Sequence, residues 1–291
     1  MRKFIIAIAV MGLIPMALKA QVGPILGVEV EKEIVKNFSA TIEAEYRWKD
    51  AFEDTERISG TFGLDYKVNK YFKFGASYAL LHKKEHYVKE WKSDTAVLNY
   101  WQNRHRFNGY VTGSYKLGNF KFSLRERFQY TMWDKTKIRR MKDEWGENIK
   151  DENGNKINVT YKEGRYKPMM RSRLQVEFDK KKAKFIPYVG IEFFNLLSPD
   201  TDYDEVETGG NYYKDSNGEY KHVAPGAEGK GTHTKVEEKS LDRIRYSAGV
   251  EYKIAKHSKL KLYYNFNDNR NSEPADNDVK HQIGLSYKFD F

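Results

Sequence analysis

The stretch that decides the fold is VKHQIGLSYKFDF, residues 279–291, at the end of the chain. Every second position shares one side of an extended chain, and these positions are Val279, His281, Ile283, Leu285, Tyr287, Phe289 and Phe291. The positions between them are Lys280, Gln282, Gly284, Ser286, Lys288 and Asp290. Because side chains alternate between the two faces of a strand, this period of two predicts a β-strand with one apolar and one polar face.

The end of this strand resembles the C-terminal signal of Gram-negative outer-membrane barrels, which the barrel-insertion machinery reads. The residues that carry the resemblance are Ile283, Leu285, Tyr287, Phe289 and Phe291. The resemblance implies a protein of the bacterial outer membrane. Its partners would be the insertion machinery, the outer-membrane lipid and lipopolysaccharide.

The other end of the chain has the form of a secretory signal peptide. Arg2 and Lys3 precede an apolar run, residues 4–18, and Ala20 closes a plausible cleavage site before Gln21. The run is short for a membrane-spanning helix, and no later stretch is apolar enough to be one. We therefore expect a signal peptide at 1–20 and a single barrel domain at 21–291.

Composition excludes some classes of function and favours others. The chain has no cysteine, so disulfides and thiolate chemistry are absent. The formal net charge is +10, which in another setting would indicate nucleic acid. An exported chain rarely meets nucleic acid, so we assign the charge to a pore lining or to contact with anionic glycolipid. Aromatic residues make up 15% of the chain, as expected for the aromatic girdles of transmembrane barrels.

Alternating segments of about ten residues, the length of a tilted membrane strand, recur along the chain. The expected strands are 25–35, 38–48, 57–68, 71–82, 104–116, 120–132, 166–178, 185–193, 243–254, 260–266 and 279–291. They predict an all-β protein, an antiparallel transmembrane β-barrel of 10–12 strands. Bacterial barrels have even strand numbers, so we expect ten or twelve rather than the eleven segments counted. Glu126 is a misfit, because it falls in the lipid-facing phase of its strand.

The connections alternate between short turns and long segments, as periplasmic turns and extracellular loops do. The expected long loops are 83–102, 133–165, 196–238 and 267–278. Asn153-Gly154 and Asn217-Gly218 predict hairpins inside two of them.

Charged residues repeat on the faces opposite the apolar rows, and in a barrel these faces line the lumen. The candidates are Glu43, Glu45, Arg47, Arg104, Arg106, Arg125, Arg127, Arg171, Arg173, Glu177, Glu192, Arg243, Arg245 and Glu251. One interpretation is structural, since Arg–Glu pairs would fill a narrow barrel and block flow. The other is a pore in which surplus Arg attracts anions. The sequence leaves both open.

Part of this pattern is similar to an uncharacterised family of Gram-negative outer-membrane barrels, known as a domain of unknown function. The motifs are Glu43-x-Glu45-x-Arg47, Arg104-x-Arg106, Arg125-x-Arg127 and Arg171-x-Arg173. The similarity covers most of the chain after the signal peptide. It implies the barrel and its location, and it implies no substrate.

An enzyme is not expected, because no histidine lies in a segment that resembles the active sites of barrel hydrolases. His82 and His86 lie near a rim, where the i, i+4 spacing of a helical ligand pair has no meaning. The acidic segment 200–207 lacks the spacing and glycine of a calcium loop, so no metal or other cofactor is expected. Three functions remain, in this order: a narrow pore or transporter for small solutes, anions among them; a non-conducting barrel that is structural or binds a surface partner; and an outer-membrane hydrolase.

Overall fold

The computed structural model describes most of the barrel and parts of the long connections. The described residues are 22–49, 52–91, 94–134, 139–140, 158–159, 166–181, 183–198, 201–203, 212–214, 220–222, 235–237, 240–270 and 280–291. The expected signal peptide, residues 1–20, lies outside them. Among the described residues, no helix has the length and apolarity needed to cross a membrane.

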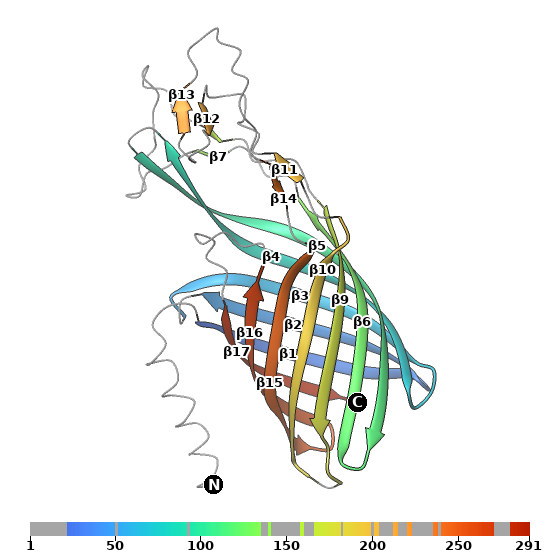
Figure 1. The fold of residues 1–291 in the computed structure, drawn as a ribbon. Helices are drawn as coiled ribbons and strands as arrows, with labels where there is room; N and C mark the ends of the chain where they lie inside the picture. Colours follow the sequence, from blue (N-terminus) through green and yellow to red (C-terminus); the bar gives the residue numbers. More distant parts are fainter. Residues whose placement is uncertain are drawn as a thin grey trace.

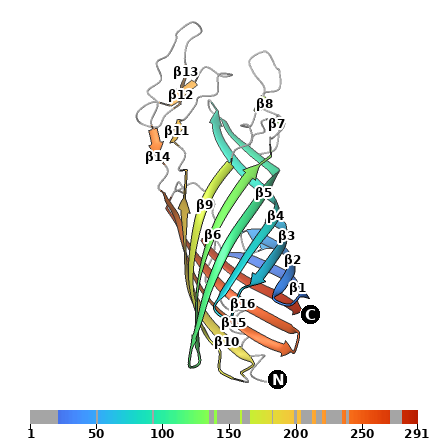
Figure 2. The ribbon, with the colours of Figure 1, turned by 90° about the vertical axis from the view of Figure 1, so that its right-hand side faces the viewer.

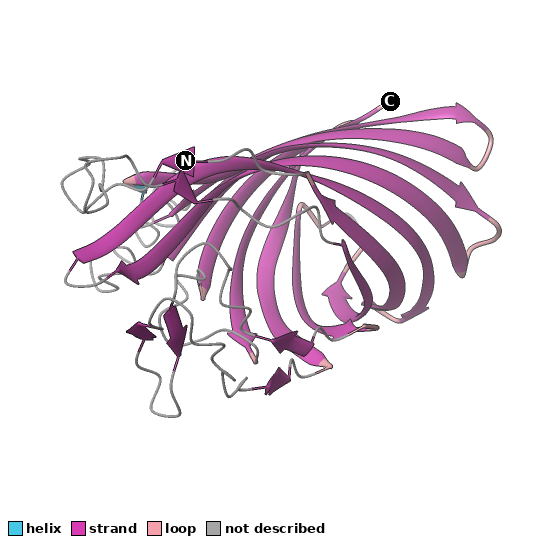
Figure 3. Ribbon diagram, turned by 90° about the horizontal axis from the view of Figure 1, so that it is seen from above, coloured by secondary structure: helices cyan, strands magenta, loops and turns pink. Residues whose placement is uncertain are grey.

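Eleven of the described strands form one closed barrel, which confirms the expected all-β barrel class (Figure 1). They are β1 (Val22–Val35), β2 (Phe38–Lys49), β3 (Asp54–Lys67), β4 (Phe72–Trp91), β5 (Asp94–Leu117), β6 (Phe120–Trp133), β9 (Tyr166–Phe178), β10 (Phe185–Leu196), β15 (Leu241–Ala255), β16 (Ser258–Asn269) and β17 (His281–Asp290). Seen from above, the strands curve around one interior (Figure 3). We call the end with the turns at 36–37, 118–119 and 256–257 the turn end, and the opposite end the loop end.

The described barrel has eleven strands, within the expected range of 10–12, but the expectation of an even number is wrong, because β1 crosses the barrel fully. With an odd number, the first and last strands run the same way, so they pair in parallel, from Val22 opposite His281 to Glu31 opposite Asp290. The barrel is antiparallel as expected except at this one seam. Every other neighbouring pair in the barrel is antiparallel.

The seam between β1 and β17 is closed by backbone and side-chain bonds together. The Phe291 amide donates to the Glu31 carbonyl at 3.0 Å, and the Glu33 amide donates to the Phe291 carbonyl at 3.1 Å. On the inner side, Lys288 Nζ donates to Glu29 Oε1 at 2.7 Å and to Glu31. The end of the expected insertion signal therefore also ties the last strand to the first.

Long connections hold more strand than the sequence predicted. Residues 83–102 were expected to form a loop, and this is wrong: β4 and β5 continue as a paired ladder to Trp91 and Asp94. The two strands rise well beyond the barrel rim (Figures 1 and 2). The polar composition of this hairpin hides the alternation that identified the other strands.

The other described pieces of the connections are short paired strands. They are β7 (Arg139–Arg140) with β8 (Asn158–Val159), β11 (Thr201–Tyr203) with β14 (Lys235–Glu237), and β12 (Tyr212–Lys214) with β13 (Tyr220–His222). The pairing of β12 with β13 flanks Asn217-Gly218, as a hairpin there requires. Asn153-Gly154 itself lies outside the described residues.

The outer wall of the barrel is apolar. Ile42, Phe74 and Leu174 on three different strands are 63%, 51% and 47% exposed, and similar residues follow on the remaining strands. An apolar surface of this extent on a folded protein marks contact with another apolar phase. The misfit Glu126 lies in this wall, where it accepts a hydrogen bond of 2.6 Å from the Ser172 hydroxyl.

Tyrosines on the inner face pack against glycines of the neighbouring strand. Tyr110 lies opposite Gly75, Tyr188 opposite Gly249, and Tyr263 opposite Gly284. A Cβ added at Gly249 would lie 2.6 Å from the Leu262 carbonyl oxygen and 2.7 Å from the Tyr188 ring. Each glycine therefore makes room for an aromatic ring that would otherwise fill the lumen.

We predict that Gly249→Ala destabilises the barrel by about 1–3 kcal/mol, the usual cost of overpacking, because the backbone oxygen cannot move aside. The matched control is Gly60→Ala, since a Cβ at Gly60 meets nothing within 4 Å. Urea unfolding of both variants in lipid vesicles measures the difference. Equal midpoints for the two variants would contradict the prediction.

At the turn end, Asp179 joins the ends of three strands. Lys116 Nζ donates to Asp179 Oδ2 at 2.9 Å, and Lys253 Nζ lies 3.6 Å from Asp179 Oδ1. The hydrogen bond from Lys116 and the two positive charges hold the pKa of Asp179 below its ordinary value. The contribution of this group to stability is thus complete above the carboxyl pKa of the unfolded chain, and it is lost as the pH falls through the lower folded value.

We therefore predict that Asp179→Asn flattens the acid side of the stability profile, between about pH 5 and pH 3. Urea midpoints of wild type and variant across that range give the comparison. A variant with the same pH slope as the wild type would show that this carboxylate contributes nothing at the turn end.

Candidate functional site

The barrel encloses a cavity of about 960 Å³ that reaches both of its ends. At the turn end it is lined by Glu31, Lys73 and Lys288, and at the loop end by Lys83 and Asn269. Side chains alternate along each strand, so the residues of this lining point inward while their neighbours in sequence face the outer wall. The cavity is the candidate functional site, because the charged side chains gather in it.

The structure places the residues named from the sequence in this lining. Cavity-lining members are Glu43, Glu45, Arg47, Arg104, Arg106, Arg125, Arg127, Arg171, Arg173, Glu177, Arg243, Arg245 and Glu251. Glu192 is not part of the lining itself. It is 6% exposed and lies behind the lining, bound to two of those arginines.

Sequence reasoning missed several lining residues. They are Glu29, Glu31, Glu56, Arg57, Asp65, Lys73, Tyr110, Lys261 and Lys288, among others. Most are single charges in a strand rather than members of an Arg-x-Arg or Glu-x-Glu pair. The alternation of side chains along each strand could have identified them. Asp65, for example, lies between the outward Leu64 and Tyr66 and must therefore point inward.

One wall of the cavity, on β1, β2 and β3, is acidic. Glu29 lies directly opposite Glu43 in the β1–β2 ladder, and Glu45 follows on the same face. Glu45 Oε1 is 2.6 Å from both Arg47 Nε and Arg57 Nη2. Glu43 has no basic side chain within ion-pair distance among the described residues. This wall therefore carries both neutralised and unneutralised carboxylates.

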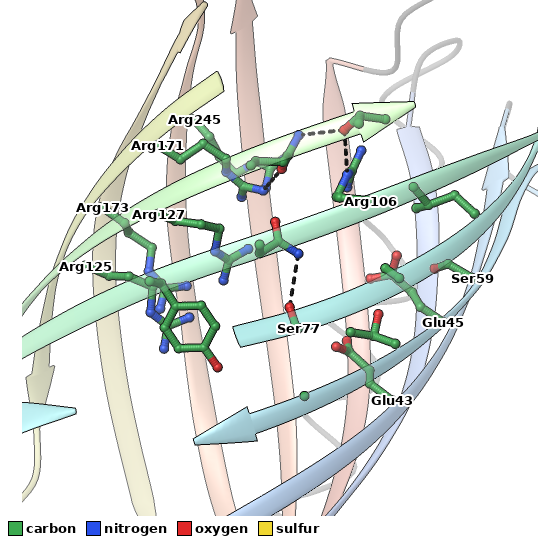
Figure 4. Close-up of a pocket in the computed structure, with 18 of the residues that line it drawn as sticks. Glu43, Glu45, Ser59, Ser77, Arg106, Arg125, Arg127, Arg171, Arg173 and Arg245 are labelled. Carbon is green, nitrogen blue, oxygen red and sulfur yellow. Dashed lines mark hydrogen bonds between the residues drawn. The ribbon is translucent and has the colours of Figure 1, made fainter. Parts of the chain in front are cut away.

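The facing wall, on β5, β6 and β9, is basic (Figure 4). Arg106 Nε donates to the Thr131 hydroxyl at 3.3 Å, and Arg125 Nε donates to the Thr112 hydroxyl at 3.0 Å. In the described part of the chain, no carboxylate lies within ion-pair distance of Arg106, Arg125, Arg127 or Arg173. The lumen thus presents unpaired guanidinium groups on one side and carboxylates on the other.

A third group of charges, around Glu192, is fully paired. Arg171 Nη2 lies 2.8 Å from Glu192 Oε1 and Arg245 Nη1 lies 3.6 Å from Glu192 Oε2. Arg171 also donates to the Gln129 side-chain oxygen at 2.9 Å. The buried Phe194 ring lies beneath the Arg171 and Arg245 guanidiniums, at 4.4 and 5.0 Å from its centroid. This cluster fits the structural interpretation of the charged residues, while the wall of unpaired arginines fits the pore.

Two histidines near the loop end, His82 and His105, are not part of the cavity lining. His82 Nδ1 hydrogen-bonds to Asn103 at 2.7 Å, and His105 binds the Tyr78 hydroxyl and Asp134 at 2.7 and 3.1 Å. Among the described residues, neither ring bonds to a serine or threonine hydroxyl, and no cluster of three metal-ligating side chains occurs. Most of the acidic segment 200–207 lies outside the described residues.

The fold and the cavity define a class, a closed β-barrel with an apolar outside and a charged interior. Residues 26–210 match the family described as "Protein of unknown function (DUF2490)", and the chain belongs to that family. No curated protein matches the chain. The crystal structure of the β-domain of the Bordetella autotransporter Brka is similar with a TM-score of 0.45 and 10% identity, over 88% of this chain and 83% of that chain.

We predict that Glu192→Gln destabilises the folded barrel by about 3–5 kcal/mol, because it leaves buried guanidiniums without their counter-charge. Glu33→Gln is the control, since Glu33 is exposed and, among the described residues, its carboxylate accepts a hydrogen bond from the Asn37 amide alone. Urea unfolding in vesicles reports both changes. A Glu192 variant as stable as the control would show that the cluster contributes no net stability.

Proposed function

We propose that the chain is an outer-membrane β-barrel whose lumen passes small solutes and favours anions. The observation that carries the proposal is the row of arginines that have no carboxylate partner among the described residues, in a cavity that reaches both ends of the barrel. Rings of Arg or Lys side chains are the selectivity elements of pores for anions. The acidic wall opposite would orient dipolar or mixed-charge solutes across the passage.

Two features of this chain support a location in the outer membrane. The wall is apolar all around, and a closed sheet leaves no unpaired backbone edge to face lipid. In that membrane the turn end would face the periplasm, as short turns do, and the β4–β5 hairpin would project outside. The insertion machinery, outer-membrane lipid and lipopolysaccharide are the partners that this location supplies.

We predict anion-selective single channels when the purified barrel is inserted in planar bilayers under a KCl gradient. Arg106→Gln should move the reversal potential towards cation preference, because it removes an unpaired lumen charge. Lys180→Gln is the matched control, since it removes the same charge from an exposed position after β9. The absence of channels, or cation preference in the wild type, would reject the proposal.

A non-conducting barrel that binds a surface partner is the second candidate, and the projecting β4–β5 hairpin favours it. Its ladder continues for pairs such as Lys83 with Gln102 and Trp91 with Asp94. Replacing residues 85–100 by a short Asn-Gly turn should then abolish contact with lipopolysaccharide or cells, while the barrel still folds. We do not propose an enzyme, and hydrolysis of lipid or peptide that depends on His82 or His105 would overturn that.

A further inference from the structure

Like charges face each other directly across β6 and β9. Arg125 is in register with Arg173, and Arg127 is in register with Arg171. Equal charges directly opposite one another destabilise a sheet. Arg171 is compensated by Glu192 and Gln129, but the other three arginines have no such partner among the described residues. We call Arg125, Arg127 and Arg173 the arginine trio.

The trio is held in position without being neutralised. The Tyr110 ring supports two of its members, with Arg125 and Arg127 at 5.0 and 5.4 Å from the ring centroid. Tyr110 is itself fixed, because its hydroxyl donates to Asp65 at 2.8 Å and its ring packs on Gly75. The cation–π contacts fix the guanidiniums and leave their charge available to a ligand.

Three inward carboxylates around the trio are paired with other bases. Glu177 binds Lys121 at 3.1 Å, and Asp65 binds Lys73 at 3.1 Å. Glu192 belongs to the paired cluster described above. Arg127 Nε is buried and has no hydrogen-bond partner within the described part of the chain. A buried donor of this kind costs free energy unless a ligand or water satisfies it.

We infer that the arginine trio is a binding site for a small phosphate-class dianion within the lumen. Guanidinium forks match the oxygens of a tetrahedral phosphate in pairs, and such charge-assisted bonds are among the strongest in proteins. A dianion bridging β6 and β9 would also screen the facing charges of Arg125 and Arg173. The inference deepens the proposed function and rests on it, because it names the class of anion that would occupy the passage.

The test is binding of radiolabelled inorganic phosphate to the purified barrel in neutral detergent, at fixed ionic strength set with chloride. We expect saturable binding, weakened at least about tenfold in Arg125→Gln/Arg173→Gln, because this variant loses two charge-assisted contacts to the ligand. Arg104→Gln is the matched control. It removes the same charge from the lumen, where Arg104 stacks on Trp133 at 5.0 Å, away from the trio.

Folding of each variant is checked by its heat-sensitive mobility on detergent gels. Because the double variant removes a facing pair of like charges, we expect it to unfold at the same or a higher urea concentration than wild type when phosphate is absent. A folded double variant that binds phosphate like wild type would overturn the site. So would equal weakening by Arg104→Gln, since that indicates only diffuse attraction.

Two further measurements are needed. The first distinguishes a small soluble phosphate from a lipid phosphate as the ligand, and the second distinguishes failure of the binding site from failure of the pore. Glycerol phosphate and sulfate should compete with the label, whereas phosphatidic acid in mixed micelles should not, because lipid does not enter the lumen. Stronger competition by the lipid would overturn a site for small dianions. If the barrel forms anion-selective channels but phosphate binding does not depend on the trio, the proposed pore stands and the proposed binding site is rejected. If binding depends on the trio but no channels form, the binding site stands and the pore is rejected.

Discussion

Closure of the backbone ladder is the constraint on which the rest of this structure depends. A sheet that faces an apolar phase cannot leave amides and carbonyls unpaired at an edge, so the first and last strands must meet. With eleven strands in the described barrel they meet in parallel, a pairing slightly weaker per residue than the antiparallel kind. Lys288, held by Glu29 and Glu31 across the seam, adds an ionic tie on the inside where the backbone ladder is weakest.

Much of the barrel could be predicted from the sequence, because closure converts an alternating pattern directly into inside and outside. The expected strand 166–178 coincides with β9, and 120–132 differs from β6 by one residue. The inward faces also follow from the phase. Arg171 and Arg173 line the cavity as alternation requires, with Ser172 on the outside bound to Glu126.

What the sequence could not provide are facts of register and of pairing between distant strands. Periodicity gives the face of Arg125 but not that Arg173 lies directly opposite it, since that depends on the alignment of β6 with β9 across a long connection. The same holds for Glu192, whose inward phase is visible but whose place behind the lining depends on the two arginines that cover it. The strand number failed for another reason: the rule of even numbers assumes antiparallel closure, which a seam such as β1–β17 does not need.

The division of the lumen into an acidic and a basic wall follows from the order of charges along the chain. In an up-and-down barrel, strands that are neighbours in sequence are neighbours in space, so a drift in charge along the sequence becomes a difference between two sides of the interior. Here the acidic side chains gather on β1 to β3 and the unpaired arginines on β5, β6 and β9. Pairing the two sets across a lumen would need side chains long enough to bridge it. The arginines that are paired instead use carboxylates on the adjacent strand or their own, as Arg171 uses Glu192 and Arg47 uses Glu45. An interior arranged in this way keeps a permanent electric field from the basic wall to the acidic wall, because the barrel wall holds the opposite charges apart.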